Sequence, residues 1–250
     1  SFSYDQDASA YLALAGISNS TQSGAVDYLV KTLKAENLWT NFVALYPLVG
    51  GTSKAHSLNL KDVSRYQIVF AAAGVTHGVN GITGDGSTGY GDTGIQFHSA
   101  LGYGGMTNCH LSVYCRTEIP NDNGHFIGVT DGAGRMGLSR LGLSLGADGP
   151  MNGNGPNPAD DLGGDFHGFM ALTRANAANE YFTATRLGVV AHSGAEAGMP
   201  TNTVHLLSRS HNGTIISFST ANLAFASVGW GLTPAQLTRL EAIVNNFETM

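Results

Sequence analysis

Apolar and polar positions alternate in short runs through the middle of the chain, and Gly, Asn, Asp and Pro separate these runs. Runs of this length, with turn residues between them and no helical period, are typical of strands that pack as a sandwich. The predicted strands are 67–72, 95–97, 111–116, 125–129, 136–145, 166–173, 181–190, 204–208, 215–218 and 223–228. The pattern therefore predicts a mainly β fold, a two-sheet antiparallel sandwich over residues 66–228.

The first part of the chain, from Asp5 to Tyr46, has the period of helices instead. Residues 8–15 are good helix formers, and Gly16 follows where a glycine commonly ends a helix. Apolar residues three and four apart then indicate an amphipathic helix over 21–34. Apolar and aromatic side chains extend this helical face from Leu38 until Pro47 stops it. We therefore predict a helical N-terminal lead-in over 1–48 that packs on or anchors the sandwich.

The clearest helix start in the chain lies near its C-terminal end. Thr233 is suited to the N-cap, Pro234 to the first helical position and Gln236 to the third, which together form a capping box. Leu232 and Leu237 supply the matching hydrophobic staple. These residues predict a helix over 234–247, which closes a sandwich unit that spans 49–250.

Two stretches rich in glycine separate the predicted strands. The tract 79–94 reads VNGITGDGSTGYGDTG, and the stretch 147–164 combines glycine with proline, asparagine and aspartate. Such residues favour turns, and long loops held by a rigid scaffold commonly carry binding sites. We therefore predict that 81–93 and 147–164 are surface loops that form one rim of the sandwich.

Composition is typical of a protein that works in an assembly or outside cells. Only 12% of the residues are charged, about half of the usual ~25%, while 34 of 250 residues are glycine. A chain with so few charges gains solubility by burying surface, so we expect a homo-oligomer or another assembly. The net charge of −6, without a cluster of Lys and Arg, argues against a nucleic-acid partner.

Compartment and redox state follow from other short patterns. No apolar run approaches the ~18–20 residues of a membrane span, and the first residues lack the pattern of a signal peptide. We therefore expect the chain to be made in a cytoplasm and not to insert into a membrane. Cys109 and Cys115 lie on one predicted strand, about 20 Å apart if it is extended, whereas a disulfide needs Cα atoms within about 7 Å. We predict that they do not pair with each other.

The sequence does not favour an enzyme. It contains no pair of acids alternating on one strand face as glycan hydrolases commonly use, and its nine histidines show neither H-x-H nor HExxH spacing. The segment Gly137–Leu141 lacks the last glycine of a G-x-S-x-G nucleophile turn. We therefore expect no catalytic residues.

Binding chemistry is restricted to a few positions. Asp85 and Asp92 carry oxygen ligands that suit a Ca²⁺ site, although aspartates in such loops also form Asx turns. Tyr90, Tyr103 and Trp230 lie among polar loop residues, so they are candidates for stacking on a sugar. The alternative is that each of these aromatic side chains plugs one end of the sandwich.

The chain resembles a family of structural proteins of tailed-bacteriophage virions. The resemblance covers nearly the whole chain, and its most distinctive segments are LWTNFVALYPLVGGT near the N-terminus and AFASVGWGLT near the C-terminus. It implies a jelly-roll sandwich of the concanavalin A-like lectin and laminin G-like type, with a helical lead-in and a C-terminal helix. Proteins of this kind are tail-fibre, adhesin or decoration components, and the resemblance carries over no catalytic residue.

Two classes of function follow. The first is a non-enzymatic virion protein on head or tail, with other virion proteins as partners, that decorates the particle or attaches it to a host-surface glycan. The second is a glycan-active hydrolase or lyase on the same scaffold. The sequence pattern favours the first class.

Overall fold

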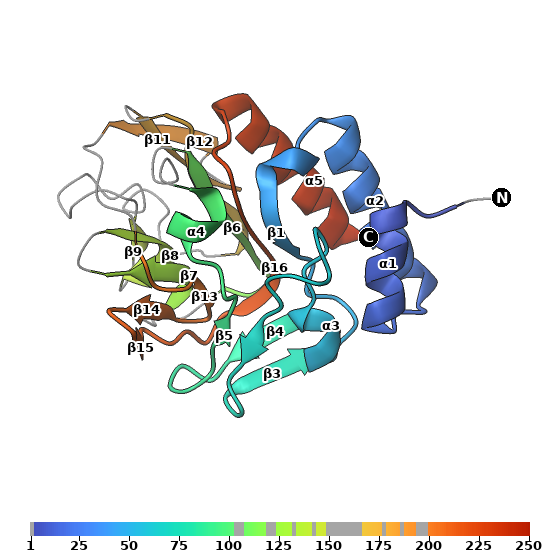
Figure 1. Cartoon of the computed structure of the whole chain (residues 1–250), viewed down its shortest axis with the longest axis horizontal. Coiled ribbons are helices and arrows are strands. Elements are labelled where there is room, and N and C mark those ends of the chain that lie inside the picture. Colours follow the sequence, from blue (N-terminus) through green and yellow to red (C-terminus); the bar gives the residue numbers. More distant parts are fainter. Residues whose placement is uncertain are drawn as a thin grey trace.

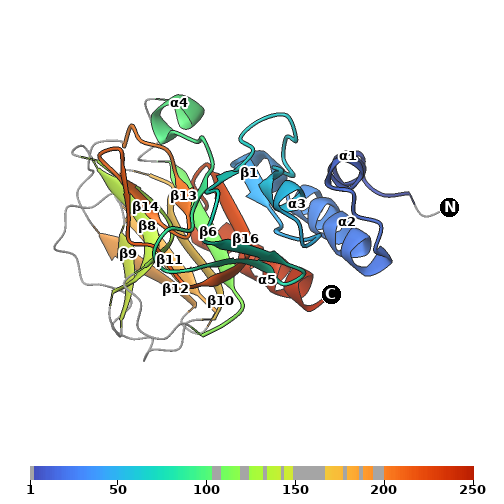
Figure 2. The same cartoon turned by 90° about the horizontal axis from the view of Figure 1, so that it is seen from below.

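Two β-sheets face each other across an apolar core, and helices cover the outer face of one of them (Figures 1 and 2). The computed structural model describes residues 3–102, 108–118, 124–131, 134–141, 144–148, 167–176, 179–185, 188–193 and 200–250. The observed fold is thus mainly β and sandwich-like with a C-terminal helix, as the sequence predicts. Among the described residues, no helix is long and apolar enough to cross a membrane.

The first sheet carries the helices and has the strand order β12-β11-β10-β6-β16-β4-β3, with β1 also paired to β16. Every pairing in this sheet is antiparallel. Its strands are β1 (Phe42–Tyr46), β3 (Val75–Gly78), β4 (Gly81–Gly84), β6 (Cys109–Cys115), β10 (Gly168–Arg174), β11 (Asn179–Ala184), β12 (Gly188–Ser193) and β16 (Asn222–Gly229).

The second sheet has the order β15-β14-β7-β13-β5-β2, and β8 joins β7 to β9. Its strands are β2 (Val69–Phe70), β5 (Gly91–Asp92), β7 (His125–Thr130), β8 (Arg135–Leu141), β9 (Ser144–Asp148), β13 (His205–Leu206), β14 (Arg209–His211) and β15 (Thr214–Ile216). Strands β14 and β7 are parallel, so this sheet is mixed rather than purely antiparallel as predicted.

Strands of the first sheet are buried on both faces. In β10, Met170 and Leu172 belong to the core between the sheets, whereas Phe169 and Ala171 pack toward the helices. Successive side chains of a strand point to opposite faces, so a covered sheet has an almost unbroken apolar sequence. Phe225 of β16 likewise contacts Phe247, with ring centroids 6.4 Å apart, and so ties the sheet to the C-terminal helix.

The helices are α1 (Gln6–Ala15), α2 (Ser20–Ala35), α3 (Ser53–Ser57), α4 (Phe97–Leu101), α5 (Pro234–Thr249) and the short 3₁₀ helix η1 (Trp39–Asn41). Gly16 ends α1 with a φ of 70°, a backbone conformation that suits glycine. The predicted capping box is present at the start of α5, where Thr233 accepts from the backbone N–H of Gln236 and Gln236 accepts from that of Thr233. The predicted C-terminal helix is therefore confirmed, two residues longer than predicted.

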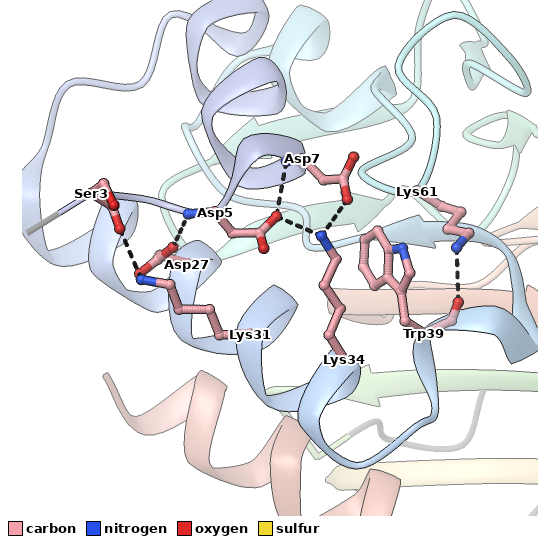
Figure 3. Close-up of polar contacts among 8 residues, drawn as sticks. All are labelled: Ser3, Asp5, Asp7, Asp27, Lys31, Lys34, Trp39 and Lys61. Carbon is pink, nitrogen blue, oxygen red and sulfur yellow. Dashed lines mark hydrogen bonds and ion pairs between the residues drawn. The ribbon is translucent and has the colours of Figure 1, made fainter.

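Ion pairs hold the beginning of the chain against α2 (Figure 3). The Lys34 ammonium lies 2.7 Å from Asp5 and 2.6 Å from Asp7. Lys34 and Lys61 also approach the ring of Trp39 from opposite sides, 5.2 Å and 4.4 Å from its centroid. Three of the four lysines, Lys31, Lys34 and Lys61, thus take part in contacts that hold the N-terminal segment in place.

The structure corrects the prediction that residues 38–46 are helical. Only Trp39–Asn41 forms a single 3₁₀ turn, and Phe42–Tyr46 is strand β1, paired with β16. Phe42 and Leu45 pack with the helices while Ala44 and Tyr46 enter the core between the sheets. An apolar run that is buried on two faces has no clear period, which is why the sequence pattern suggested a helix.

Further differences concern strand boundaries. The predicted strand 95–97 is wrong, because Phe97 begins α4. The predicted single strands 136–145 and 181–190 each correspond to two strands that pair antiparallel, β8 with β9 and β11 with β12. The tract 79–94 is not only a turn system, since β4 and β5 lie within it. Most of the stretch 147–164 lies outside the described residues, so the predicted common rim stays a prediction.

The two cysteines occupy opposite ends of β6, where both are buried. The Sγ atom of Cys109 lies 3.6 Å from the sulfur of Met136. The prediction that Cys109 and Cys115 do not form a disulfide with each other is confirmed.

Replacing Thr233 by Ala should lower the free energy of unfolding by about 1 kcal/mol, because the cap of α5 is lost. Urea denaturation followed by circular dichroism measures the change. Thr238→Ala is the matched control, since that hydroxyl bonds only the carbonyl of Pro234 in an exposed part of the same helix. Equal effects of the two substitutions would contradict the assignment of the cap.

Candidate functional site

Tyr90, a predicted sugar-stacking residue, is half-buried and stacks on a histidine. Its ring lies parallel to that of His205, with an interplanar angle of 9° and centroids 5.3 Å apart. One face of the Tyr90 ring is therefore already occupied within the protein. Tyr103 lies outside the described residues.

Trp230 is held at the joint between β1 and β16. Its backbone N–H donates to the carbonyl of Asn41 at 2.7 Å, and its backbone carbonyl accepts from Nδ1 of His110 at 2.6 Å. Burial lowers the pKa of His110 to about 4, so this imidazole is neutral with its proton on Nδ1. The Trp230 side chain is partly buried against the core. These contacts favour the plug alternative over a sugar-binding role.

Asp85 and Asp92, the candidate calcium ligands, bond separate partners. Asp85 accepts from the backbone N–H groups of Ser87, Thr88 and Gly89 and from the hydroxyl of Thr88, and these bonds hold the pKa of its carboxyl far below the usual range. This is the geometry of an Asx turn.

Asp92 lies nearer to histidine than to a second acid. It accepts from the N–H of Gly94 at 2.9 Å, and its Oδ1 is 3.7 Å from Nε2 of His205. The described part of the chain holds no group of three or more His, Cys, Asp or Glu side chains placed to bind a metal. The geometry of Asp85 and Asp92 thus favours structural turns, and the Ca²⁺ site stays a prediction.

Asp92, His205 and Ser208 superficially resemble a hydrolytic triad. The Ser208 hydroxyl is 3.4 Å from Nδ1 of His205, and Asp92 faces the other ring nitrogen. However, Ser208 is 0% exposed and His205 is 4% exposed, so a substrate cannot reach the hydroxyl. A nucleophile has to contact the reacting atom, so this arrangement is structural.

A polar groove of ≈ 530 Å³ lies on the outer face of the first sheet, beside the C-terminal end of α5. Its described lining residues are Asn80, Thr83, Tyr114, Arg116, Thr117 and Asn222. In β6 the inward side chains of Val113 and Cys115 alternate with Tyr114, which packs toward the helices. The same alternation continues to Arg116 just after the strand. Asn222 of β16 is paired opposite Thr83 of β4, which brings these polar side chains together.

Asn222 presents a hydrogen-bond acceptor that the described residues do not satisfy. Its amide nitrogen donates to the hydroxyl of Thr83 at 2.8 Å and, more weakly, to the carbonyl of Ile82 at 3.4 Å. The amide oxygen is buried and accepts no hydrogen bond from the described part of the chain. A buried acceptor without a partner is destabilising.

Arg116 is held in the groove by a buried glutamate from α5. The Glu248 carboxylate lies 2.6 Å from the Arg116 guanidinium, and the side chains are 1% and 34% exposed, respectively. Burial raises the pKa of Glu248 to about 7, because it outweighs the opposing effect of Arg116. Burial, reinforced by the charge of Glu248, also raises the pKa of Tyr114, which keeps its hydroxyl protonated.

None of the groove residues was predicted from the sequence. The alternation in HLSVYCRT indicates that Tyr114 and Arg116 share one strand face. No local pattern indicates that this face meets Glu248, which lies more than 130 positions away. The pairing depends on where α5 packs, and that is set by tertiary contacts.

Comparisons with known proteins leave the chain without an established family. No model of a protein family matches the sequence, and no curated protein is similar to it in sequence. Among solved structures, the fold is similar to that of the botulinum neurotoxin serotype G binding domain, with 8% identity and a TM-score of 0.38. The match covers 82% of this chain and 51% of that one, so this chain spans about half its length. A similarity at this level carries no functional argument.

Glu248→Gln should change how stability depends on pH. A carboxyl whose pKa rises from 4.5 to about 7 on folding stabilises the protein fully below pH 4.5 and loses this contribution as the pH rises through 7. Relative to the natural chain, the variant should therefore gain about 3 kcal/mol in free energy of unfolding between pH 4 and pH 8. Urea denaturation at several pH values measures the difference.

Glu36→Gln is the control for this experiment. The Glu36 side chain is 32% exposed, and its hydrogen bond to Arg239 lowers the pKa of its carboxyl. Its contribution to stability is present above the unfolded pKa and is lost as the pH falls, so the variant should shift in the opposite direction. Parallel pH profiles for the natural chain and Glu248→Gln would show that Glu248 has an ordinary pKa.

Proposed function

We propose that this chain is a non-enzymatic structural protein of a tailed-bacteriophage virion. It presents a lectin-like surface on head or tail, as a decoration or as the part that attaches the particle to a host-surface glycan. The sandwich is of the concanavalin A-like, laminin G-like jelly-roll type in this proposal. The resemblance of the sequence to such virion proteins and the sandwich-like fold support it.

One observation carries the proposal. The two most distinctive segments of the resemblance, 38–52 and 224–233, are direct partners, because β1 pairs with β16. The contact extends past the paired strands, because the side-chain amide of Asn41, just before β1, donates to the carbonyl of Gly231, just after β16. A Cβ atom on Gly229 would overlap the carbonyl oxygen of Asn41, so the close approach requires glycine in the VGWG sequence. The resemblance therefore concerns one structural unit rather than two unrelated stretches.

The described side chains support binding rather than turnover. Glu248 has the raised pKa that a general acid needs, yet its carboxyl is 1% exposed and cannot reach a substrate in the groove. Ser208 is buried as well. The groove offers mostly amides and hydroxyls, which bind hydroxylated ligands without transforming them. A hydrolase or lyase on the same scaffold is the alternative function.

The helical lead-in is the proposed attachment to other virion proteins or to further copies of this chain. Tyr4 and Leu14 are large apolar residues that are 45% and 46% exposed there. Aromatic and aliphatic side chains of this kind anchor protein interfaces, while charged residues are depleted from interface cores. The low charge of the whole chain suits such contacts.

The location of the protein tests the proposal directly. Antibodies against the purified chain should label the heads or tails of particles produced from the genome that encodes it, and mass spectrometry should detect the chain in those particles. The purified chain should release no sugar fragments from bacterial polysaccharides. Absence from the particles, or turnover of a polysaccharide, would overturn the proposal.

Leu14→Asp should reduce the amount of the chain in particles by about ten-fold or more, because a charge in an apolar interface core is strongly unfavourable. Its thermal unfolding should stay close to that of the natural chain, since the side chain is exposed. Val69→Asp is the matched control, because Val69 is 70% exposed on β2 of the second sheet. Equal loss from both variants would indicate that the lead-in is not the specific attachment.

A further inference from the structure

We propose that the polar groove on the outer face of the first sheet binds a saccharide that carries a carboxylate, with Arg116 contacting the acid group. This inference rests on the proposed function, because it assigns the glycan-binding surface of that proposal to this groove. The sequence-based candidates Tyr90, Tyr103 and Trp230 play no part in it.

Arg116 supplies the recognition of the acid. It is the one charged residue among the described residues that line the groove, and its side chain is 34% exposed. A guanidinium has five N–H donors, and the structure shows Glu248 as the partner of one terminal nitrogen. Donors remain for a carboxylate, which a guanidinium binds through charge-assisted hydrogen bonds.

Glu248 positions the arginine from below without blocking the groove. Its carboxyl is 1% exposed and lies 2.6 Å from the guanidinium, so it fixes the side chain from the protein side. Burial favours the neutral form of Glu248, which leaves part of the positive charge of Arg116 uncompensated at neutral pH. The groove therefore presents a positive group that is fixed in place, in a chain with few other cations.

The remaining lining residues indicate a sugar rather than a simple anion. Apart from Arg116, the described lining consists of hydroxyl, phenol and amide groups, which suit the many hydroxyls of a sugar. Thr83, Thr117 and Asn80 add hydroxyl and amide groups, and Tyr114 adds a protonated phenol. The volume of ≈ 530 Å³ is in the range of small-ligand sites.

Matched pairs of ligands test the class of sugar. The probes are methyl glucuronide against methyl glucoside and methyl galacturonide against methyl galactoside. Each pair is titrated into the purified full chain and followed by NMR. At least one acidic member should bind about ten-fold or more tightly than its neutral partner, the size expected for a hydrogen bond to a charged group. Equal binding within every pair, or no binding at all, would overturn the proposal.

Variants test whether Arg116 and Glu248 act as described. Arg116→Gln should abolish the preference for the acidic probe. Because this change leaves a buried carboxyl without its partner and can impair folding, the double variant Arg116→Gln with Glu248→Gln is measured beside it. Glu248→Gln alone should raise the affinity for the acidic probe about three- to five-fold at pH 7.5, because a competing negative charge is removed. A preference that persists in the double variant would contradict the proposal.

Threonine variants locate the sugar and separate the two proposals. Thr117→Ala should weaken binding of the acidic probe, whereas Thr214→Ala, an exposed position on β15 of the second sheet, should not. Equal effects would place the sugar elsewhere. These titrations need only the purified chain. A failure of groove binding would therefore not change the labelling of particles, and absence from particles would not change the result of the titrations.

Discussion

The structure depends on β16, a strand that is paired along both edges and buried on both faces. β6 pairs with one edge, while β4 and β1 share the other. Leu223, Ala226 and Val228 enter the core between the sheets, and Phe225 faces the helices. Because β1 follows the N-terminal helices and α5 follows β16, this one strand fixes both ends of the chain on the sandwich. A strand in this position tolerates neither a shift of register nor a change of side-chain volume.

The polar side chains between β6 and β16 form one buried chain of hydrogen bonds. His110 donates to the carbonyl of Trp230 through Nδ1, so its Nε2 accepts from the hydroxyl of Ser227, 3.1 Å away. The hydroxyl of Ser227 lies 2.6 Å from that of Ser112. A neutral imidazole is the form that fits, and burial favours it. The network gives the joint a defined geometry that apolar contacts alone would not specify.

Features that depend on neighbouring residues could be predicted from the sequence, whereas features that depend on tertiary contacts could not. The capping box of α5 and the helix over 21–34 involve neighbouring residues, and both helices are present. The segment 38–46 was misassigned because its burial on two faces hides the period of a strand. In the tract 79–94, Gly81 is required by the close approach of the Leu223 carbonyl as well as by its turn. The groove was missed because Arg116 and Glu248 meet only once α5 has packed.

The use of charge in this chain argues for a role of the Arg116–Glu248 pair beyond stability. Charged residues are few, and Lys34 and Lys61 are engaged in contacts that hold the N-terminal helices. Burying a carboxyl beside an arginine contributes little net stability, since desolvation offsets the attraction, and apolar residues of similar volume commonly serve as well. Glu248 nevertheless lies under Arg116 where the guanidinium lines the groove. An ion pair that does little for folding, placed so that its arginine lines a polar groove, is accounted for by a ligand that uses the guanidinium.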